Sequence, residues 1–334
     1  FFDTSFSVEP MPDNDADGGV GGIVGAGYYG LTIDDCHVDA TVTGWKSVGG
    51  IIGKAGDGSS SSDVIITDST FTGRIETEDE EIEGDWPGFA GGILGNGFRN
   101  VTIRDCDVSA VIAGWNGDPY GGTQMGGIAG HIGASGSGTV PTIDSCSFTG
   151  TVNCTATYCG GIVGNAAYHA LINNSYAAEG LVYSKSNSVG GVAGYIDIGG
   201  LYNSYSRIQV HGQSFVGGLV GDLRQSNMEN CFRAVYYGVT QNGNYGAIAV
   251  GYKSNSNISN IVWSIHSGYD NVTRSCSHDG GGPGDYSNDS CTYVGDCNNA
   301  YFHNYANQPI ASWDFPPWST ENNGISTPTL VRSV

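Results

Sequence analysis

The residues best suited to bind a metal ion form a short acidic cluster near the start of the sequence. Asp13, Asp15 and Asp17 are separated by single residues and are followed by Gly18. This spacing places three carboxylates on one side of a tight turn, as in the first half of a calcium-binding loop. The glutamate that completes such a loop is missing, because Val24 occupies its position. We therefore expect no cofactor, with calcium at this cluster as the alternative.

A second acidic group could take part in hydrolysis. Asp34 and Asp35 resemble the paired aspartates of pectin-hydrolysing β-helices, but no Gly-His-Gly or Arg-x-Lys sequence follows them. Residues at the same place in later repeats are of the types that hydrogen-bond to backbone at turns. These residues are Thr67-Asp68, Asp144-Ser145 and Asn173-Asn174. The chain also lacks a His-Glu-x-x-His zinc motif. We expect the protein not to be an enzyme, and a polysaccharide-active enzyme is the alternative.

These residues belong to a repeat that runs along most of the chain. Each copy begins with a Gly-Gly-x-x-Gly element, and a stretch of alternating apolar residues follows it. The copies begin at Gly21, Gly49, Gly91, Gly126, Gly160, Gly190 and Gly217, with a degenerate copy at Gly246. A chain that turns sharply needs either a positive φ angle or a close backbone approach, and glycine supplies both.

A second element follows the glycines of each copy and is expected to be a strand. After Asp34-Asp35-Cys36, for example, Val38, Ala40 and Val42 alternate with polar residues. Such a unit cannot bury its apolar face alone and must stack on the next one. The sequence therefore predicts an all-β fold, a β-solenoid (β-helix) of about seven to eight coils, with an N-terminal extended strand and an irregular C-terminal cap.

The repeats resemble the GLUG motif, which is found in tandem in bacterial surface and secreted proteins. The sequences Asn174-Ser175-Tyr176 and Asn203-Ser204-Tyr205 are close to the family pattern, and the Trp313-Asp314-Phe315 region is similar to the segment that closes many GLUG arrays. The resemblance implies a β-solenoid over residues 18–265, preceded by a strand and acidic tether over 1–17 and followed by a cysteine-containing cap over 266–334. It implies little about activity, because such repeats serve as stalks, adhesive surfaces and accessory regions.

Four of the nine cysteines, Cys36, Cys106, Cys146 and Cys231, lie at matching repeat positions. Cys106 and Cys146 are one coil apart, so their backbones should be about 4.8 Å apart, which suits either a disulfide or two stacked thiols. An odd number of cysteines leaves at least one thiol free or intermolecular. Cys36, beside Ser69 of the next coil, is the candidate for a buried free thiol.

The remaining cysteines are expected to close shorter loops. Cys154 and Cys159 are near enough in sequence to clip a turn. Cys276, Cys291 and Cys297 should tie the C-terminal region together, with Cys231 as a further candidate partner.

Composition indicates an extracellular protein. Cysteines and Asn-x-Ser/Thr sequons together fit an oxidising, glycosylating compartment. The sequons are at Asn100, Asn153, Asn173, Asn257, Asn271 and Asn288. The net charge of −21 argues against nucleic acid and anionic membranes as partners, and no apolar run is long enough for membrane insertion. The chain begins at Phe1 rather than methionine, which is consistent with removal of a signal peptide.

The N-terminal strand suggests how the protein assembles. Phe1, Phe2, Phe6 and Val8 lie on a short alternating stretch, which Pro10 and Pro12 separate from the first coil. This strand could cap its own subunit or add to the sheet edge of the next one, and the second contact would produce a fibre. We favour a self-assembling extracellular filament, so the expected partner is the protein itself.

A monomeric adhesin or stalk that binds surface glycans is the alternative. Tyrosines along one face would suit sugar stacking, although a ladder between coils is the favoured interpretation of them. They include Tyr168, Tyr176, Tyr205, Tyr236 and Tyr237.

Overall fold

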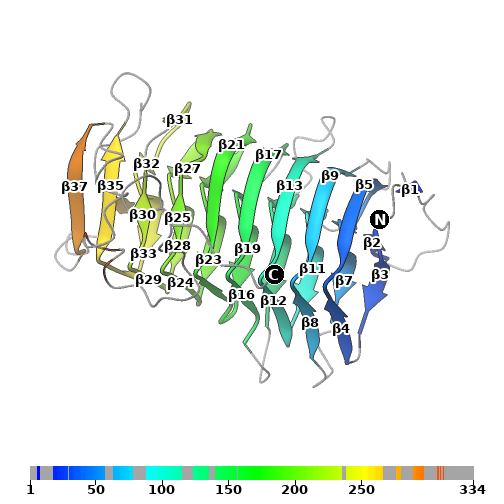
Figure 1. Cartoon of the computed structure of the whole chain (residues 1–334). Helices are drawn as coiled ribbons and strands as arrows, with labels where there is room; N and C mark the ends of the chain where they lie inside the picture. The colour runs from blue at the N-terminus through cyan, green and yellow to red at the C-terminus, as the bar shows by residue number, and fades with distance from the viewer. Residues whose placement is uncertain are drawn as a thin grey trace.

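The structure is a computed structural model and consists of parallel β-sheets. It describes residues 6–7, 18–28, 30–56, 63–77, 88–114, 123–134, 140–155, 157–234, 238–265, 276–279, 289–296, 307, 309 and 311. These residues form strands and no α-helix. Four sheets stack their strands coil upon coil into a rod, in which equivalent strands lie side by side from one coil to the next (Figure 1). The predicted β-solenoid fold is therefore confirmed.

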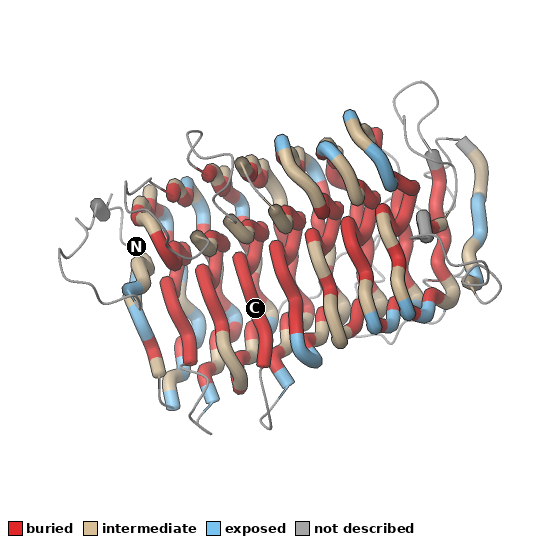
Figure 2. The backbone as a smooth tube through the Cα atoms, turned by 180° about the vertical axis from the view of Figure 1, so that it is seen from behind, coloured by how far each residue is buried: buried red, intermediate tan, exposed pale blue. Residues whose placement is uncertain are grey.

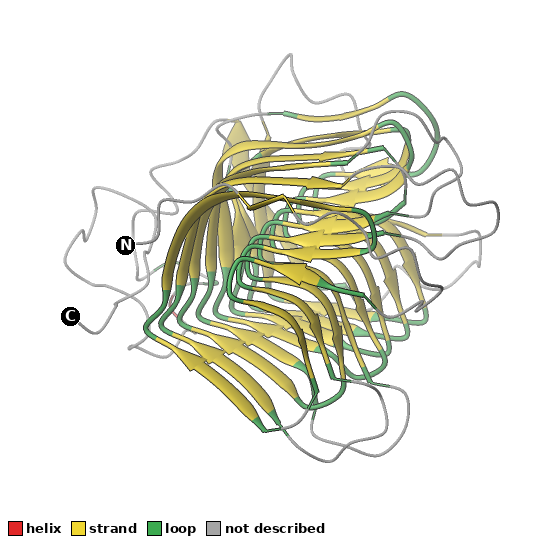
Figure 3. Ribbon diagram, turned by 90° about the vertical axis from the view of Figure 1, so that its right-hand side faces the viewer, coloured by secondary structure: helices red, strands yellow, loops and turns green. Residues whose placement is uncertain are grey.

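Each coil visits the four sheets in a fixed order, and we number the sheets 1 to 4 in that order. One coil consists of β6 (Ser47–Gly49), β7 (Ile52–Ala55), β8 (Val64–Thr67) and β9 (Thr70–Thr77). Every strand pairs in parallel with its counterpart in the next coil, so that Ile52 of β7 lies opposite Leu94. Seen along the rod in Figure 3, successive strands lie one behind another. Equivalent positions of the repeat thus become columns of neighbouring side chains.

The strands of each sheet follow one another along the rod. Sheet 1 contains β2 (Val20–Gly21), β6, β10 (Phe89–Gly91), β14 (Gln124–Gly126), β18 (Cys159–Gly160), β22 (Asn187–Gly190), β27 (Ser214–Gly217) and β32 (Gly246–Ala247). Sheet 2 contains β3 (Val24–Gly27), β7, β11 (Leu94–Phe98), β15 (Ala129–Gly133), β19 (Val163–Ala167), β23 (Ala193–Asp197), β28 (Val220–Arg224), β33 (Val250–Ser254) and β36 (Ser277–Asp279).

Sheets 3 and 4 complete the coil. Sheet 3 contains β4 (Leu31–Asp34), β8, β12 (Val101–Arg104), β16 (Thr142–Asp144), β20 (Leu171–Asn173), β24 (Gly200–Tyr202), β29 (Asn227–Glu229) and β34 (Asn257–Ser259). Sheet 4 contains β1 (Phe6–Ser7), β5 (His37–Gly44), β9, β13 (Asp107–Ala113), β17 (Ser147–Cys154), β21 (Tyr176–Ser184), β25 (Tyr205–Ser206), β26 (Gln209–Gly212), β30 (Phe232–Arg233), β31 (Val239–Gln241), β35 (Ile261–Ile265) and β37 (Cys291–Asp296).

The interior is a set of apolar columns that runs the length of the rod, visible as the buried stretches in Figure 2. Val38, Ala40 and Val42 of β5 are buried, as their alternation predicted. The apolar residue that follows each glycine pair is buried from Ile51 to Ile248, whereas Ile23 of the first copy is 45% exposed. Each coil therefore buries its apolar residues against its neighbours, and within the described part of the chain Ile23 has a neighbouring coil on one side only.

Close backbone approach explains the Gly-Gly-x-x-Gly element. A Cβ atom on Gly91 would lie 2.4 Å from the carbonyl oxygen of Leu94, and one on Gly92 would lie 2.6 Å from that of Gly127. A Cβ atom on Gly95 would lie 2.5 Å from the carbonyl oxygen of Gly53. The glycines with positive φ lie elsewhere, at Gly30, Gly56, Gly73, Gly150, Gly180 and Gly295 among the described residues. Of the two reasons that the sequence offered for glycine, close approach is the one that applies here.

The corner between sheets 3 and 4 explains the second repeated element. One residue at this corner has a positive φ in each coil, and these are Asp35, Asp68, Asp105, Ser145, Asn174, Asn203, Asn230 and Asn260. Asp and Asn tolerate this left-handed conformation better than other non-glycine residues. The repeated Asx residue therefore lets the chain turn from sheet 3 into sheet 4.

Strands of the same chain pair at both ends of the rod. The N-terminal strand β1 pairs in parallel with β5 of its own chain, with Phe6 opposite Val42. At the other end, β36 pairs with β33 and β37 pairs with β35. Two sheets thus continue beyond residue 265, where the sequence placed the boundary of the repeat region.

Candidate binding surface

Several predicted site residues lie outside the part of the chain that the structure describes. These are Asp13, Asp15 and Asp17 of the acidic cluster, Phe1, Phe2 and Val8 of the assembly strand, Asn271 and Asn288 among the sequons, and Cys297. Within the described residues, no group of three or more His, Cys, Asp or Glu side chains could hold a metal ion. No helix in that part of the chain is long and apolar enough to cross a membrane.

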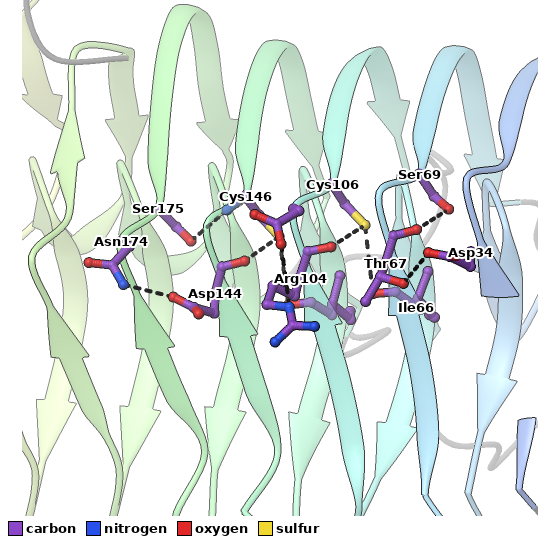
Figure 4. Close-up of polar contacts among 12 residues, drawn as sticks. Asp34, Ile66, Thr67, Ser69, Arg104, Cys106, Asp144, Cys146, Asn174 and Ser175 are labelled. Atoms are coloured by element: carbon purple, nitrogen blue, oxygen red, sulfur yellow. Dashed lines mark hydrogen bonds and ion pairs between the residues drawn. The ribbon is translucent and has the colours of Figure 1, made fainter. Parts of the chain in front are cut away.

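Asp34 is the last residue of β4, at the corner between sheets 3 and 4 (Figure 4), and Asp35 follows it in the chain. Asp34 accepts a hydrogen bond from Thr67 Oγ1 of the next coil at 2.6 Å, and Asp35 has φ of 53°. In a later coil, Asn174 Nδ2 donates to Asp144 Oδ1 at 2.8 Å. These contacts link neighbouring coils. They agree with the prediction that the aspartate pair lies at a turn and hydrogen-bonds locally.

The cysteine predictions are only partly correct. Cys154 is bonded to Cys159 and Cys276 to Cys291, so the expected turn clip and one C-terminal link are present. Cys106, Cys146 and Cys231 are buried free thiols, so the disulfide considered for the first two does not form. Equivalent residues in parallel strands have parallel rather than converging Cα–Cβ bonds, which disfavours a bond between stacked cysteines. Cys36 is also free, but it is only half-buried.

The thiols belong to a column of cysteine and serine side chains inside the same corner. Ser69 Oγ donates to the carbonyl oxygen of Thr67 at 2.7 Å and accepts from the backbone N–H of Cys36 at 3.2 Å. Cys106 Sγ likewise donates to the carbonyl oxygen of Arg104 at 3.2 Å, and Cys146 Sγ to that of Asp144 at 3.3 Å (Figure 4). The side chains of this column therefore hydrogen-bond to the backbone of the corner. Its thiols, Cys106 and Cys146, form no disulfide with each other.

The described sequons differ in accessibility. Asn257 is exposed at the start of β34, and Asn153 and Asn173 are half-buried in β17 and β20. Asn100 is buried, with 3% of its surface exposed. A glycan on the Asn100 side chain is incompatible with this fold, which corrects the prediction for that site.

Two of the five tyrosines singled out form a ladder. The ring of Tyr205 stacks on Tyr176 at 4.8 Å between centroids and on Phe232 at 4.5 Å. Both faces of Tyr205 are therefore covered, and the residue is buried. Tyr168 is 50% exposed, and Tyr236 and Tyr237 lie outside the described residues. The ladder interpretation holds for Tyr176 and Tyr205.

A different set of aromatic residues gathers on the outer face of sheet 2. Ile196 and Leu223 of β23 and β28 are fully buried, so Tyr195 and Arg224 beside them point to the opposite face. Further rings reach this face from sheet 1 and from the next coil. We call the following residues the aromatic surface: Tyr158, Tyr195, Phe215, Arg224, Tyr245 and Tyr252.

The aromatic surface is built around Arg224. Its guanidinium carbon lies 5.6 Å from the ring centroid of Tyr195 and 5.5 Å from that of Tyr252, a distance at which cation–π attraction operates. Tyr158 stacks on Tyr195 with 4.7 Å between centroids. Phe215 contacts both Tyr245 and Tyr252, at 5.3 and 5.1 Å.

Asp222 fixes the orientation of Arg224. Nε and one terminal nitrogen of Arg224 donate to the two carboxylate oxygens of Asp222 at 3.0 and 2.8 Å. The Asp222 side chain is 2% exposed and that of Arg224 is 43% exposed. Burial raises the pKa of Asp222, and the hydrogen bonds from Arg224 oppose that rise. The same hydrogen bonds raise the pKa of Arg224, so the arginine stays charged.

Carboxylates also affect the neighbouring tyrosines. Burial, followed by the charge of Asp197, raises the pKa of Tyr195. Burial and the charge of Asp222 raise the pKa of Tyr158. Both phenols therefore remain protonated at neutral pH and can donate as well as accept hydrogen bonds.

The sequence prediction missed this surface, although the repeat contains a signal for it. The residue after the last glycine of each element forms a single column on sheet 2, shown by the register of paired strands. The column includes Asn96, His131, Asn165, Tyr195, Asp222 and Tyr252. Aligning the copies at that position would have shown tyrosine at Tyr195 and Tyr252, with Asp222 between them.

The stacked parallel sheets define a β-solenoid protein, and its described residues include the aromatic surface on sheet 2. No family model matches the chain, and no solved structure matches it significantly. Halomucin of Haloquadratum walsbyi is 28% identical to it over 208 residues, which are 61% of this chain. The chain spans about 2% of the length of Halomucin.

Proposed function

We propose that the chain is an extracellular structural segment, a stiff β-solenoid rod within or on a cell-surface protein. The observation that carries this proposal is the continuous parallel pairing of all four sheets from coil to coil, in which the register shifts only at β17–β21, β33–β36 and β35–β37 among the described strands. Two further features support it, namely the two disulfides, which suit an oxidising compartment, and the similarity to part of a protein named as a mucin. The resemblance to GLUG repeats stays a hypothesis.

Surface labelling would test the location. Antibodies raised against the folded chain should bind intact cells of the source organism, and external protease should remove that signal. An antibody against a cytosolic protein serves as the control for leakage. Labelling that requires cell lysis would overturn the proposal.

End-to-end assembly into a filament is a second candidate function. The observation that favours it is the N-terminal end of the rod, where Ile23 is exposed and Val20 and Leu31 are only half-buried. Their counterparts in the next coil, Ile51, Val48 and Val64, are buried. Because β1 already pairs with β5 of its own chain, we now expect any such contact to use this end face rather than strand exchange.

Two variants separate the two modes of assembly. If the end face mediates assembly, Ile23→Asp should abolish filaments in electron micrographs, and deletion of residues 1–9 should leave them intact. Strand exchange predicts the reverse. Intact protein that sediments as a monomer at high concentration would exclude both modes and leave the rod as a monomeric stalk.

A further inference from the structure

The aromatic surface on sheet 2 has more exposed functional groups than stacking between coils requires. In the ladder of sheet 4, both faces of Tyr205 are covered by other rings. On sheet 2, Tyr245 remains 40% exposed, and Tyr158, Tyr195, Phe215 and Tyr252 are all half-buried. This surface therefore offers ring area to a ligand, in contrast to the ladder.

Arg224 adds oriented hydrogen-bond donors to this surface. Two of the five N–H groups of a guanidinium are used by Asp222, and the exposed side chain leaves others facing solvent. Because Asp222 is buried and bidentate, the guanidinium is held before any ligand arrives. The entropy cost of ordering a long side chain on binding is thereby reduced.

Asp197 adds an acceptor. It lies opposite Arg224 in the register of β23 and β28. Its Oδ1 atom is buried and has no hydrogen-bond partner among the described residues. Asp197 as a whole is only half-buried, so its carboxylate borders the aromatic surface and can accept a hydrogen bond from a ligand hydroxyl there.

The charges around this surface select the class of ligand. Asp197 and Asp222 flank the arginine, and the chain has a net charge of −21, so an anionic polymer would be repelled. A simple cation would meet the fixed positive charge of Arg224. A neutral polyhydroxylated ligand fits best, because its hydroxyl groups both donate and accept while its C–H faces pack on aromatic rings.

We propose that the aromatic surface is a binding site for neutral glycans, centred on Arg224, Asp197 and Tyr245. Tyr195 and Tyr252 are separated by two coil spacings, about 10 Å along the rod, which corresponds to an extended disaccharide. A linear glycan would therefore lie along the rod axis, with its hydroxyl groups at Arg224 and Asp197 and a ring face on Tyr245. This inference concerns the surface itself and does not depend on where the rod is located.

Calorimetric titration of the full chain would test the site. The probes are a β-1,4-linked glucose tetramer, an N-acetylglucosamine trimer and, as the acidic counterpart, a galacturonate tetramer. We expect at least one neutral probe to bind with an affinity that is insensitive to ionic strength. No binding of either neutral probe, or binding of the galacturonate tetramer alone, would overturn the proposal.

Matched variants would locate the binding. Tyr245 and Tyr168 are both exposed tyrosines with positive φ, at 61° and 50°, so asparagine should be tolerated at each. Tyr245→Asn should weaken neutral glycan binding about three- to tenfold, and Tyr168→Asn should leave it unchanged. Arg224→Lys keeps the positive charge but loses the planar guanidinium group and its several N–H donors, so it should also weaken binding. Equal affinities in all three variants, with unchanged circular dichroism, would show that the glycan binds elsewhere and would refute the assignment.

Discussion

His131 is a titratable residue that becomes buried when the chain folds. It is 9% exposed, its ring packs near Phe89 and Phe98, and its Nδ1 atom lies 3.0 Å from Gln124 Oε1. None of these three neighbours carries a charge that could stabilise an imidazolium. Burial lowers the pKa of His131 to about 4, so the folded protein holds this ring neutral.

The pH dependence of stability should reflect this residue. Because the pKa of His131 falls on folding from 6.5 to about 4, protonation favours the unfolded chain. Its stabilising contribution is complete above pH 6.5 and is lost as the pH falls towards 4, by at most about 3 kcal/mol. The same column has Asn96 and Asn165 in adjacent coils, so His131→Asn should fold. Urea unfolding at several pH values should show a smaller loss in this variant than in the wild type, and equal losses would contradict the assignment.

Thiol reactivity should separate the free cysteines by burial. Cys106, Cys146 and Cys231 are buried, and burial raises the pKa of the Cys231 thiol to about 12. Reactive thiolate is therefore scarce at Cys231, and burial keeps reagents away from all three thiols. A water-soluble maleimide should label Cys36 of the native chain and leave the other three unmodified until denaturant is added. Mass spectrometry of peptides would read the sites, and rapid native labelling of Cys106 would refute the buried column.

At the scale of the element, the paired glycines determine how closely neighbouring segments of the rod can approach. The second glycine of a pair faces the next coil and the side chains of sheet 4. A Cβ atom on Gly92 would be 2.4 Å from Val108 Cγ1 and 2.6 Å from the carbonyl oxygen of Gly127. Real Cβ atoms do not approach backbone so closely, so each pair fixes the spacing between coils.

Replacing such a glycine should destabilise the rod. We expect Gly92→Ala to lower the free energy of unfolding by about 1–3 kcal/mol or more, because the methyl group meets backbone that cannot move aside. Gly18→Ala is the matched control, since nothing lies within 4 Å of a Cβ atom there. Thermal unfolding followed by circular dichroism would compare the two, and similar midpoints would contradict the close-approach explanation.

On the scale of the whole molecule, the distribution of charge is uneven between core and surface. The interior columns are mostly apolar, and exposed residues such as Asp39, Glu179 and Glu229 carry part of the net charge of −21. Like charges on a rod repel one another, and folding brings them closer than the unfolded chain does.

Salt should therefore stabilise the protein. Raising the concentration of sodium chloride shortens the distance over which these charges interact, so the melting temperature should rise with ionic strength. A variant with Asp39→Asn, Glu179→Gln and Glu229→Gln carries three fewer negative charges and should show a shallower rise. Differential scanning calorimetry would measure both slopes. A melting temperature that falls or stays constant with added salt would show that surface repulsion is unimportant here.

The sequence by itself determined the β-solenoid, because alternating apolar residues within a repeat can be buried only by stacking equivalent strands. It also located the Cys154–Cys159 link, whose partners are close in the chain, and the ladder of Tyr176 and Tyr205, which follows from equal repeat positions. Contacts within one coil or between equivalent positions are local consequences of the repeat.

Only the tertiary structure decided features that depend on how different columns meet. Close approach at the paired glycines arises between sheets 1 and 2, and the free state of Cys106 and Cys146 depends on the direction of their side chains. The position of β1 against β5 and the gathering of Tyr195, Arg224, Phe215 and Tyr245 likewise join segments from different sheets or coils. The repeat period alone does not specify which side chains from neighbouring sheets share a face, since that depends on how each coil bends at its corners.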